Sequence, residues 1–348
     1  MASKRASKRV KREQTKLIEF LQRYAEVAIS DPEMIATIQH LDLRPYDCRR
    51  IPKLNMLSML QTLDLTMTMY SDLTCLPESL WQLAALQELT IRHCGMTNLS
   101  ESLGQLTALQ KMRIDDCIML PSLPESLRQL AALHTLEIIY CESLTCLPES
   151  LGLLPALHTL LVCNCRRLVY LPASLGQLAA LQTLITGSEL RPALAGQFNM
   201  LQELKLHGRA VACLAEFLKQ PELARLGRLE IAHDGEMGRL PELLGKLVTL
   251  RELRIICFKL PCLPKTLGRL TALESVHLGG SAHLRAVPGF VCNVKGTVDV
   301  VCWNGKRKKM YNYFQSLLMM VLCMRRRYGW HPRLPDEILL EVKTAAEE

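Results

Sequence analysis

The most regular feature of the chain is a short apolar pattern, LxxLxL, that returns along most of its length. Clear copies are LQELTI from Leu86, LQKMRI from Leu109 and LRELRI from Leu250. Eleven copies begin at residues 38, 60, 86, 109, 133, 157, 181, 201, 226, 250 and 273, at intervals of 20 to 26 residues. A steady period of this length indicates a repeat architecture in which each repeat is one strand-and-turn unit.

Each repeat has two halves with different periodicities. The apolar fourth and sixth positions of LxxLxL are two residues apart, as in a strand with one buried face. The apolar first position turns the chain inward just before the strand. The second half, as in LPESLRQLAA from Leu123, opens with a proline that suits the entry to a short helical turn. One repeat cannot bury its apolar side alone, so stacked copies are expected to share a continuous core.

Cysteine takes the ninth position of four consecutive repeats, at Cys94, Cys117, Cys141 and Cys165. The chain bends there as it leaves the strand, and a small buried donor can satisfy backbone carbonyls that have lost their partners. The competing interpretation is a metal site, because thiolates bind zinc. Strands stacked about 4.8 Å apart would place the four sulfurs in a line and not in the tetrahedron that zinc takes. We therefore expect a structural cysteine ladder.

On these motifs the chain resembles a leucine-rich repeat protein. The pattern LxxLxLxxC followed by LPxSLGxL covers about residues 38–290, and it is similar to the plant-type repeats of intracellular immune receptors. The resemblance implies an α/β solenoid, curved, with a parallel sheet on the concave face, short helical turns on the convex face and a partner-binding role. The P-loop of those receptors is missing from the sequence. The second halves after Leu181 and Leu201 are degenerate, so a kink or a longer helix is expected there.

Positions two, three, five, seven and eight of each repeat are expected to face solvent from the concave side of the sheet. These positions are apolar in the middle repeats and charged in the neighbouring ones. An apolar centre with a polar rim is typical of protein interfaces, so we predict a site for a protein or peptide partner here. The predicted partner-binding residues are Arg113, Asp115, Asp116, His134, Glu137, Ile139, Tyr140, His158, Leu161, Cys163 and Ile185. The alternative is that a tail or long neighbouring side chains cover them.

The motifs give little support to metal, cofactor or catalytic chemistry. Six of the nine histidines fall on the predicted concave face, where His134 and His158 take the same position in adjacent repeats. Two such ligands without a third histidine or a convergent carboxylate fall short of a metal site, so ordinary surface histidines are expected. HExxH, GxSxG, CxxC and GxGxxG do not occur. We expect a protein that is not an enzyme and that uses no cofactor or metal.

Composition and charge indicate where in the cell the protein is expected to act. Hydrophobic residues make up 49% of the 348, but no apolar run reaches the roughly 20 residues that span a bilayer. No signal peptide opens the chain, so we expect a cytoplasmic protein whose fourteen cysteines are free. The net charge of +8 lies at the ends: residues 1–12 carry six bases and no acid, and residues 306–348 carry nine bases and five acids. Such arms can bind nucleic acid, serve nuclear import or simply be solvated.

The two ends differ from the repeats. Residues 1–13 are predicted to be a disordered basic tail, and 14–37 an N-terminal capping helix. The predicted apolar face of that helix consists of Leu17, Ile18, Leu21, Tyr24, Ala25 and Ala28. Residues 291–348 are predicted to form a C-terminal cap, with a closing strand over 296–306 followed by helices. Within this cap, LPDEILLEV from Leu334 is similar to the opening of an F-box, although a capped terminal helix explains it as well.

Three functional hypotheses follow. The leading one is a non-enzymatic module that binds a protein or peptide on the concave face, in signalling or defence. The second is a substrate-recruiting subunit of a ubiquitin ligase, on the F-box resemblance. The third is a nuclear or nucleic-acid-associated protein that acts through its basic ends.

Overall fold

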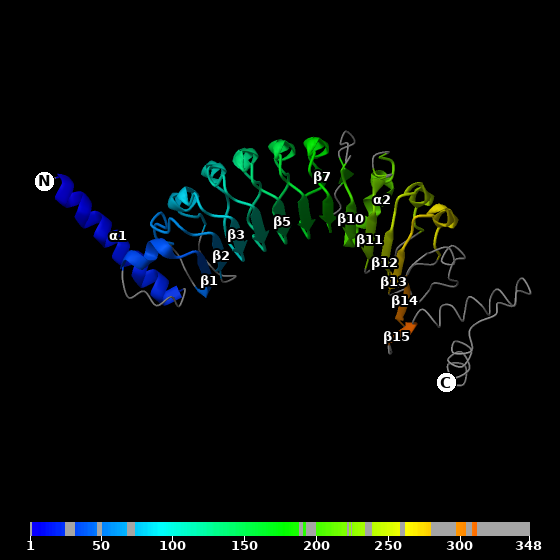
Figure 1. Cartoon of the computed structure of the whole chain (residues 1–348), viewed down its shortest axis with the longest axis horizontal. Helices are drawn as coiled ribbons and strands as arrows, with labels where there is room; N and C mark the ends of the chain where they lie inside the picture. The colour runs from blue at the N-terminus through cyan, green and yellow to red at the C-terminus, as the bar shows by residue number, and fades with distance from the viewer. Residues whose placement is uncertain are drawn as a thin grey trace, which may run out of the picture. The chain divides into compact units, whose positions relative to one another are not determined.

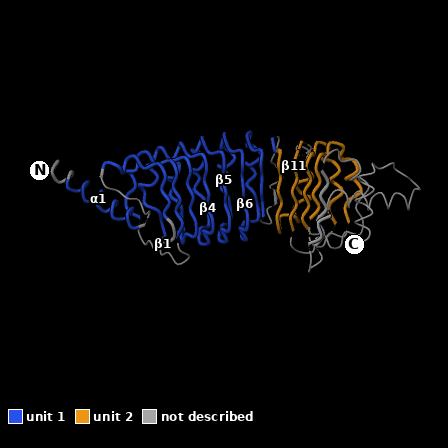
Figure 2. Tube along the Cα trace, turned by 60° about the horizontal axis from the view of Figure 1, so that its bottom comes forward, with its two compact units in different colours: residues 1–201 blue, residues 202–348 orange. Residues whose placement is uncertain are grey.

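The computed structural model describes the backbone of residues 2–24, 32–46, 51–67, 74–187, 191–192, 200–220, 223, 225–233, 239–257, 262–279, 297–303 and 308–311. The chain forms two compact units, Met1–Leu201 (unit 1) and Gln202–Glu348 (unit 2), coloured separately in Figure 2. Each unit contains a parallel β-sheet, with the strands on one side and short helical turns on the other (Figure 1). The repeat architecture and the α/β solenoid class predicted from the sequence are confirmed.

The sheet of unit 1 follows chain order, and each strand pairs in parallel with the next. Its strands are β1 (His40–Tyr46), β2 (Thr62–Met67), β3 (Glu88–Arg92), β4 (Lys111–Asp115), β5 (Thr135–Ile139), β6 (Thr159–Cys163) and β8 (Thr183–Thr186). Two short strands, β7 (Tyr170–Leu171) and β9 (Arg191–Pro192), form a separate pair. Every strand of the main sheet begins at the third position of an LxxLxL copy.

The sheet of unit 2 is built in the same way and ends in a hairpin. Its parallel strands are β10 (Glu203–His207), β11 (Arg228–His233), β12 (Glu252–Cys257), β13 (Ser275–Gly279) and β14 (Thr297–Trp303). β14 lies within the predicted closing strand. β15 (Lys308–Tyr311) pairs antiparallel with β14. The expectation of a helix over these four residues is therefore wrong, because they extend the sheet. The LPDEILLEV segment lies outside the described residues.

The second half of each regular repeat forms a 3-10 turn. These turns are η2 (Glu78–Gln82), η3 (Glu101–Gln105), η4 (Glu125–Gln129), η5 (Glu149–Leu153), η6 (Ala173–Gln177), η9 (Glu242–Lys246) and η10 (Lys265–Arg269). In the degenerate repeat after Leu201, η7 (Gly208–Cys213) runs directly into α2 (Leu214–Phe217). The longer helix expected there is confirmed. The corresponding segment after Leu181 lies largely outside the described residues.

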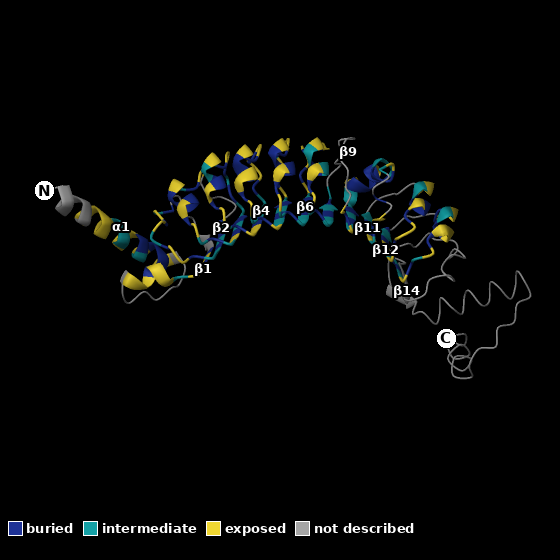
Figure 3. Cartoon of the chain, turned by 45° about the horizontal axis from the view of Figure 1, so that its top comes forward, coloured by how far each residue is buried: buried dark blue, intermediate teal, exposed yellow. Residues whose placement is uncertain are grey.

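The core lies between the strands and the turns, as the colouring in Figure 3 shows. Strand burial alternates, so that in β5 Leu136 and Ile138 are fully buried while their neighbours are half-exposed. Leu133, at the first position, is also fully buried. The leucines of LxxLxL therefore all point inward, as the sequence predicts.

The cysteine ladder is confirmed as a structural feature. Cys94, Cys117, Cys141 and Cys165 are each at most 1% exposed. The Cys141 thiol donates to the carbonyl of Ile139 over 3.5 Å, and the Cys165 thiol donates to the carbonyl of Cys163 over 3.5 Å. Burial raises the pKa of Cys94 to about 11 and that of Cys117 to about 12, so both thiols keep their protons at neutral pH. Among the described residues no group of three or more metal-binding side chains is close enough to hold an ion.

A second ladder, which the sequence did not predict, runs along the turns. The turn η6 is preceded by Pro172, which has no side chain able to cap it. Instead the carboxylate of Glu149, one repeat earlier, accepts hydrogen bonds from the backbone of Ala173 (3.3 Å) and Ser174 (3.1 Å). Glu101, Glu125 and Glu242 do the same for the turns that follow them. These four glutamates, each the first residue of its own turn, therefore act as N-caps for the turn of the following repeat.

Replacing Glu149 by glutamine is expected to lower the free energy of unfolding by about 0.5–1 kcal/mol at neutral pH. Partial burial opposes ionisation, but the hydrogen bonds from Ser174 and Ala173 outweigh it and hold the pKa of Glu149 below its ordinary value of 4.5. A depressed pKa stabilises the fold above that ordinary value, and the contribution disappears as the pH falls through the folded-state pKa. Urea unfolding of wild type and variant at pH 7 and below pH 4 should show the difference shrink in acid.

The matched control for this prediction is Glu142→Gln, at a glutamate that is 49% exposed and pairs with the exposed Arg166. We expect a change within about 0.5 kcal/mol there. Equal losses in the two variants would contradict the capping role of Glu149.

The N-terminal segment departs from its prediction. α1 spans Ala2–Tyr24 and is followed by η1 (Pro32–Thr37), so the expectation of disorder over residues 1–13 is wrong from Ala2 onward. Residues 2–24 contain no glycine or proline and many strong helix formers. The helix contacts η1 and β1, with Leu17 and Leu21 fully buried. The ammonium group of Lys53 lies 2.9 Å from the carboxylate of Glu13 and ties α1 to the first repeats.

The predicted apolar face of this helix is found in part. Phe20 is buried beside Leu17 and Leu21, although it was not predicted to be, and Ile18 is half-buried. The Tyr24 side chain, Ala25 and Ala28 lie outside the description. Of the helices that the structure describes, none combines the length and the apolar character needed to cross a membrane.

Candidate protein-binding surface

The strand register of unit 1 places equivalent positions of successive repeats side by side. Arg113 lies opposite Glu137, Glu137 opposite Leu161, and Leu161 opposite Ile185. A second row joins Asp115, Ile139 and Cys163 in the same way. Because side chains alternate along a strand, both rows point away from the core. We call the surface formed by these rows the sheet face of unit 1.

The middle of this face is apolar. The apolar patch consists of Ile139, Leu161, Cys163 and Ile185, on β5, β6 and β8. All four are half-buried, so each keeps part of its surface in contact with solvent. Gly187 ends the second row, where an added Cβ would approach the Cys163 sulfur to 3.2 Å. Burial raises the pKa of the Cys163 thiol to about 11, so it contributes as a small apolar group at neutral pH.

A cluster of paired charges borders the patch on the side of β4. The Arg113 guanidinium bonds to the carboxylates of both Asp115 (2.7 Å) and Glu137. Lys111 lies 3.9 Å from Glu137 as well. Burial would lower the pKa of Arg113, but the two carboxylates outweigh it and raise that pKa. This rim is therefore held in place by its own ion pairs before any partner arrives.

The residue just before each ladder cysteine has a left-handed backbone. His93, Asp116, Tyr140 and Asn164 have φ values between 52° and 57°. The backbone N–H of Tyr140 donates to the carbonyl of Cys163 in the next repeat, over 3.0 Å. The N–H groups of His93 and Asp116 donate in the same way to the carbonyls of Asp115 and Ile139. Asparagine and aspartate tolerate this conformation, but a bulky side chain such as that of Tyr140 is strained in it. The Tyr140 side chain is nevertheless half-exposed at the edge of the apolar patch.

Replacing Tyr140 by glycine is expected to raise the free energy of unfolding by about 0.5–1 kcal/mol, because glycine adopts a positive φ without strain. The gain is reduced by the greater freedom of glycine in the unfolded chain. Urea unfolding of the full chain measures it. The control, Asn164→Gly, should gain only a few tenths of a kcal/mol, since asparagine already tolerates the conformation. A less stable Tyr140→Gly variant would show that tyrosine is kept for packing and not for an exposed role.

His134 and His158, which take the same position in adjacent repeats, have stacked rings. The rings of His134 and His158 lie 5.2 Å apart between centroids and 9° from parallel. The Nδ1 of His158 is 2.5 Å from the carbonyl oxygen of Ala156, which fixes Nδ1 as the protonated nitrogen. Both rings lie at the start of their strands, beside the sheet face and not within the apolar patch.

The structure brings most of the predicted residues together and separates a few. Arg113, Asp115, Glu137 and the apolar patch form one continuous area across β4, β5, β6 and β8. Asp116 and Tyr140 lie beyond the strand ends, where Asp116 is 2.7 Å from the Nδ1 of His93. Lys111 on β4 borders this area, and His93 lies beyond the end of β3 beside Asp116; both are missing from the predicted set. The hydrogen bond of His93 with Asp116 and the ion pair of Lys111 with Glu137 depend on strand register, which the repeat spacing could have supplied.

The sheet face of unit 2 has a different character. Arg228 lies between Glu203 (3.3 Å) and Glu252 (2.7 Å), and Glu252 in particular raises the pKa of this arginine. His207 Nε2 is 3.3 Å from the Glu230 carboxylate. Among the solvent-facing positions of these repeats, only the seventh carries apolar residues, namely Ala232 and Ile256. These rows are mostly self-paired charges, so unit 2 offers no apolar centre comparable to that of unit 1 among its described residues.

Strands at LxxLxL, prolines before 3-10 turns and a buried cysteine ladder define a leucine-rich repeat protein. The family model described as "At1g61320/AtMIF1, LRR domain" matches residues 83–273, more than half of the chain. The chain belongs to this family. No curated protein matches it.

Three solved structures illustrate the likeness. The leucine-rich repeat protein LIC12759 of Leptospira interrogans is 23% identical with a TM-score of 0.50, and the match covers 77% of this chain and 63% of that one. The leucine-rich repeat domain of the type III effector XopL is 25% identical with a TM-score of 0.43, covering 69% and 76%. The plant peptide hormone receptor RGFR1, solved in complex with RGF2, is 18% identical with a TM-score of 0.37, covering 73% and 50%. The likeness to the Leptospira protein shows a shared fold.

Proposed function

We propose that the sheet face of unit 1 binds a protein or peptide partner, with the apolar patch at the centre of the contact. The observation that carries this proposal is the pair of apolar rows, Leu161 with Ile185 and Ile139 with Cys163. The neighbouring strand β4 instead carries the charged Arg113 and Asp115 in these rows. Apolar side chains that remain partly exposed and are gathered in register are costly in water and are typical of interaction sites.

The chemistry of the surface indicates what kind of partner fits. Three neighbouring strands span about 10 Å, so the patch suits a few apolar side chains of the partner. The rim of Arg113, Asp115 and Glu137 is already paired internally and would contribute selectivity more than affinity. Strained Tyr140 at the edge supplies the large aromatic group that interfaces favour.

The role we propose is binding and not catalysis, since leucine-rich repeats commonly serve as extended binding surfaces. A place in intracellular signalling or defence, in cytoplasm or nucleus, belongs to the same proposal and rests on the sequence resemblance. A ligase-recruiting role rests only on residues 334–342, which lie outside the described structure.

The test is site-specific photo-crosslinking of the full chain in native lysate. A photoreactive phenylalanine analogue replaces Leu161 or Ile185 in the patch, or Leu153 on the turn η5, which is 57% exposed on the opposite side of the same unit. The proposal requires one protein to crosslink from both patch positions and not from position 153. A protein that crosslinks only from position 153, or no crosslink from the patch, would overturn it.

A further inference from the structure

The N-terminal half of α1 carries a basic face. Lys4, Lys8, Arg12 and Lys16 are spaced four apart and therefore form a line along the helix, and Arg5 and Arg9 form a second line beside it. With Lys11, all seven bases fall within an arc of about 160° at 100° per residue. Lys8, Arg9, Lys11, Arg12 and Lys16, whose side chains are described, are all exposed. In Figure 1 this half of α1 extends away from the repeats of unit 1.

Helix stability does not explain these charges. The positive end of the helix dipole lies at the N-terminus and favours acidic residues, but the first turn of α1 has none. Like charges four apart also destabilise a helix. The first acid is Glu13, which lies 3.6 Å from Arg9 and 2.9 Å from Lys53. The buried residues Leu17 and Leu21 anchor the C-terminal half of the helix. The basic N-terminal half remains helical although both the helix dipole and the repulsion between its bases oppose it.

We propose that the basic face of α1 binds the phosphate backbone of duplex nucleic acid without reading its base sequence. From Lys4 to Lys16 the helix is about 18 Å long, enough to reach several phosphates. A single helix also fits the major groove of a duplex, which is about 12 Å wide. The contribution is independent of the sheet face of unit 1, because it uses a different surface and a different kind of partner.

Two other polyanions fit the helix less well. A helix that lies on an anionic membrane needs bulky apolar residues opposite its bases. Residues 2–13 offer only Val10 and two alanines there, and Leu17, Phe20 and Leu21 are buried against the first repeats. Single-stranded nucleic acid is held largely by stacking on aromatic side chains. The first aromatic residue of the chain is the buried Phe20.

The test measures binding of the full chain to a fluorescent 20-base-pair DNA duplex of arbitrary sequence at several salt concentrations. About four phosphate contacts predict a slope of log K against log salt near −3.6, which is about a 150-fold loss of affinity between 50 and 200 mM. Lys8→Gln with Arg12→Gln should make the slope about 1.8 less steep and weaken binding about 60-fold at 0.1 M salt. Glutamine preserves the helix propensity.

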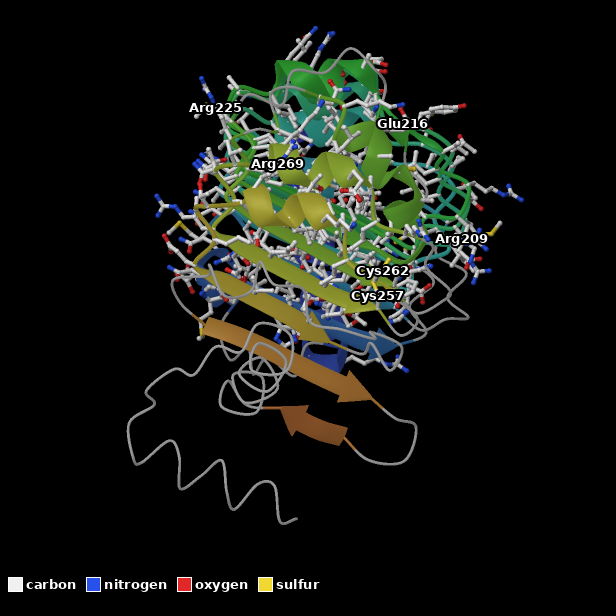
Figure 4. The ribbon with its side chains drawn as sticks, turned by 90° about the vertical axis from the view of Figure 1, so that its right-hand side faces the viewer. Arg209, Glu216, Arg225, Cys257, Cys262 and Arg269 are labelled. Carbon is white, nitrogen blue, oxygen red and sulfur yellow. The ribbon has the colours of Figure 1, made fainter. Side chains whose placement is uncertain are left out.

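The control variant is Lys246→Gln with Arg269→Gln, which removes the same charge from exposed positions on η9 and η10. Arg269 lies on the turn side of unit 2, as Figure 4 shows. This control should bind like the wild type. Equal losses in the two variants, or unchanged binding by the Lys8 and Arg12 variant, would overturn the proposal, because the whole-chain charge or another basic segment would then be responsible. Tighter binding to vesicles containing 30% phosphatidylserine than to the duplex would assign the face to membranes instead.

Discussion

Gly152→Ala is expected to lower the free energy of unfolding by about 2–3 kcal/mol, although it adds a single methyl group. A Cβ at this position would lie 2.1 Å from the carbonyl oxygen of Ser174 and 2.5 Å from its Cβ. Ser174 belongs to η6, the turn that stacks on η5 in the next repeat. Because the obstacle is mainly backbone, the two turns must separate, and the loss spreads to the interface between neighbouring repeats.

Urea unfolding of the full chain measures this loss. Gly227→Ala is the control, since the nearest atom to its added Cβ would be the Gln202 carbonyl oxygen at an ordinary 3.7 Å. That variant should lie within about 0.5 kcal/mol of the wild type. A Gly152→Ala protein as stable as the Gly227→Ala protein would contradict the close stacking of the turns.

The strands could be predicted from the sequence because the leucine pattern admits one solution. The side chains of Leu133, Leu136 and Ile138 can all point to the same side only if a strand begins between Leu133 and Leu136. All three are fully buried. The ladder cysteines were predictable for the same reason, since the ninth position follows from the period. Repetition supplied the evidence, because each weak local signal recurs in many repeats.

Contacts between repeats could not be read from single repeats. Glu149 looks like an ordinary acidic residue in a helical turn, yet its partners are the backbone amides of Ala173 and Ser174 in the next repeat. The positive φ of Tyr140 could not be predicted from the sequence either, because glycine is the usual signal for that conformation and the sequence has tyrosine there.

The charge pattern at the N-terminus led to the wrong expectation. A run of six bases without an acid resembles disordered segments in composition, but α1 begins at Ala2. Composition ignores that Ala, Lys and Arg are strong helix formers and that Leu17 and Leu21 anchor the helix from its other half. For the sheet face, the residues of the patch were predictable, whereas the pairing of Arg113 with both Asp115 and Glu137 required the register.

Leu161→Glu is expected to weaken binding of the partner at least 30-fold, about 2 kcal/mol, while the protein remains folded. The partner would bury a carboxylate at the centre of the apolar patch with no cation assigned to it, since Arg113 is already paired with Asp115 and Glu137. In the free protein the side chain faces solvent, so the free energy of unfolding should change by less than about 1 kcal/mol.

We expect the apolar patch, and not the turn side, to hold the partner. The most direct measurement is the dissociation constant of the partner isolated by crosslinking, determined for wild type, Leu161→Glu and Leu153→Glu, with unfolding free energies measured alongside. Leu153 is the same residue type at 57% exposure on η5, so the two variants make the same chemical change on opposite sides of unit 1. We predict at least a 30-fold loss for Leu161→Glu and less than a twofold change for Leu153→Glu. Comparable affinities for Leu161→Glu and the wild type, or a greater loss for Leu153→Glu, would show that the patch does not hold the partner.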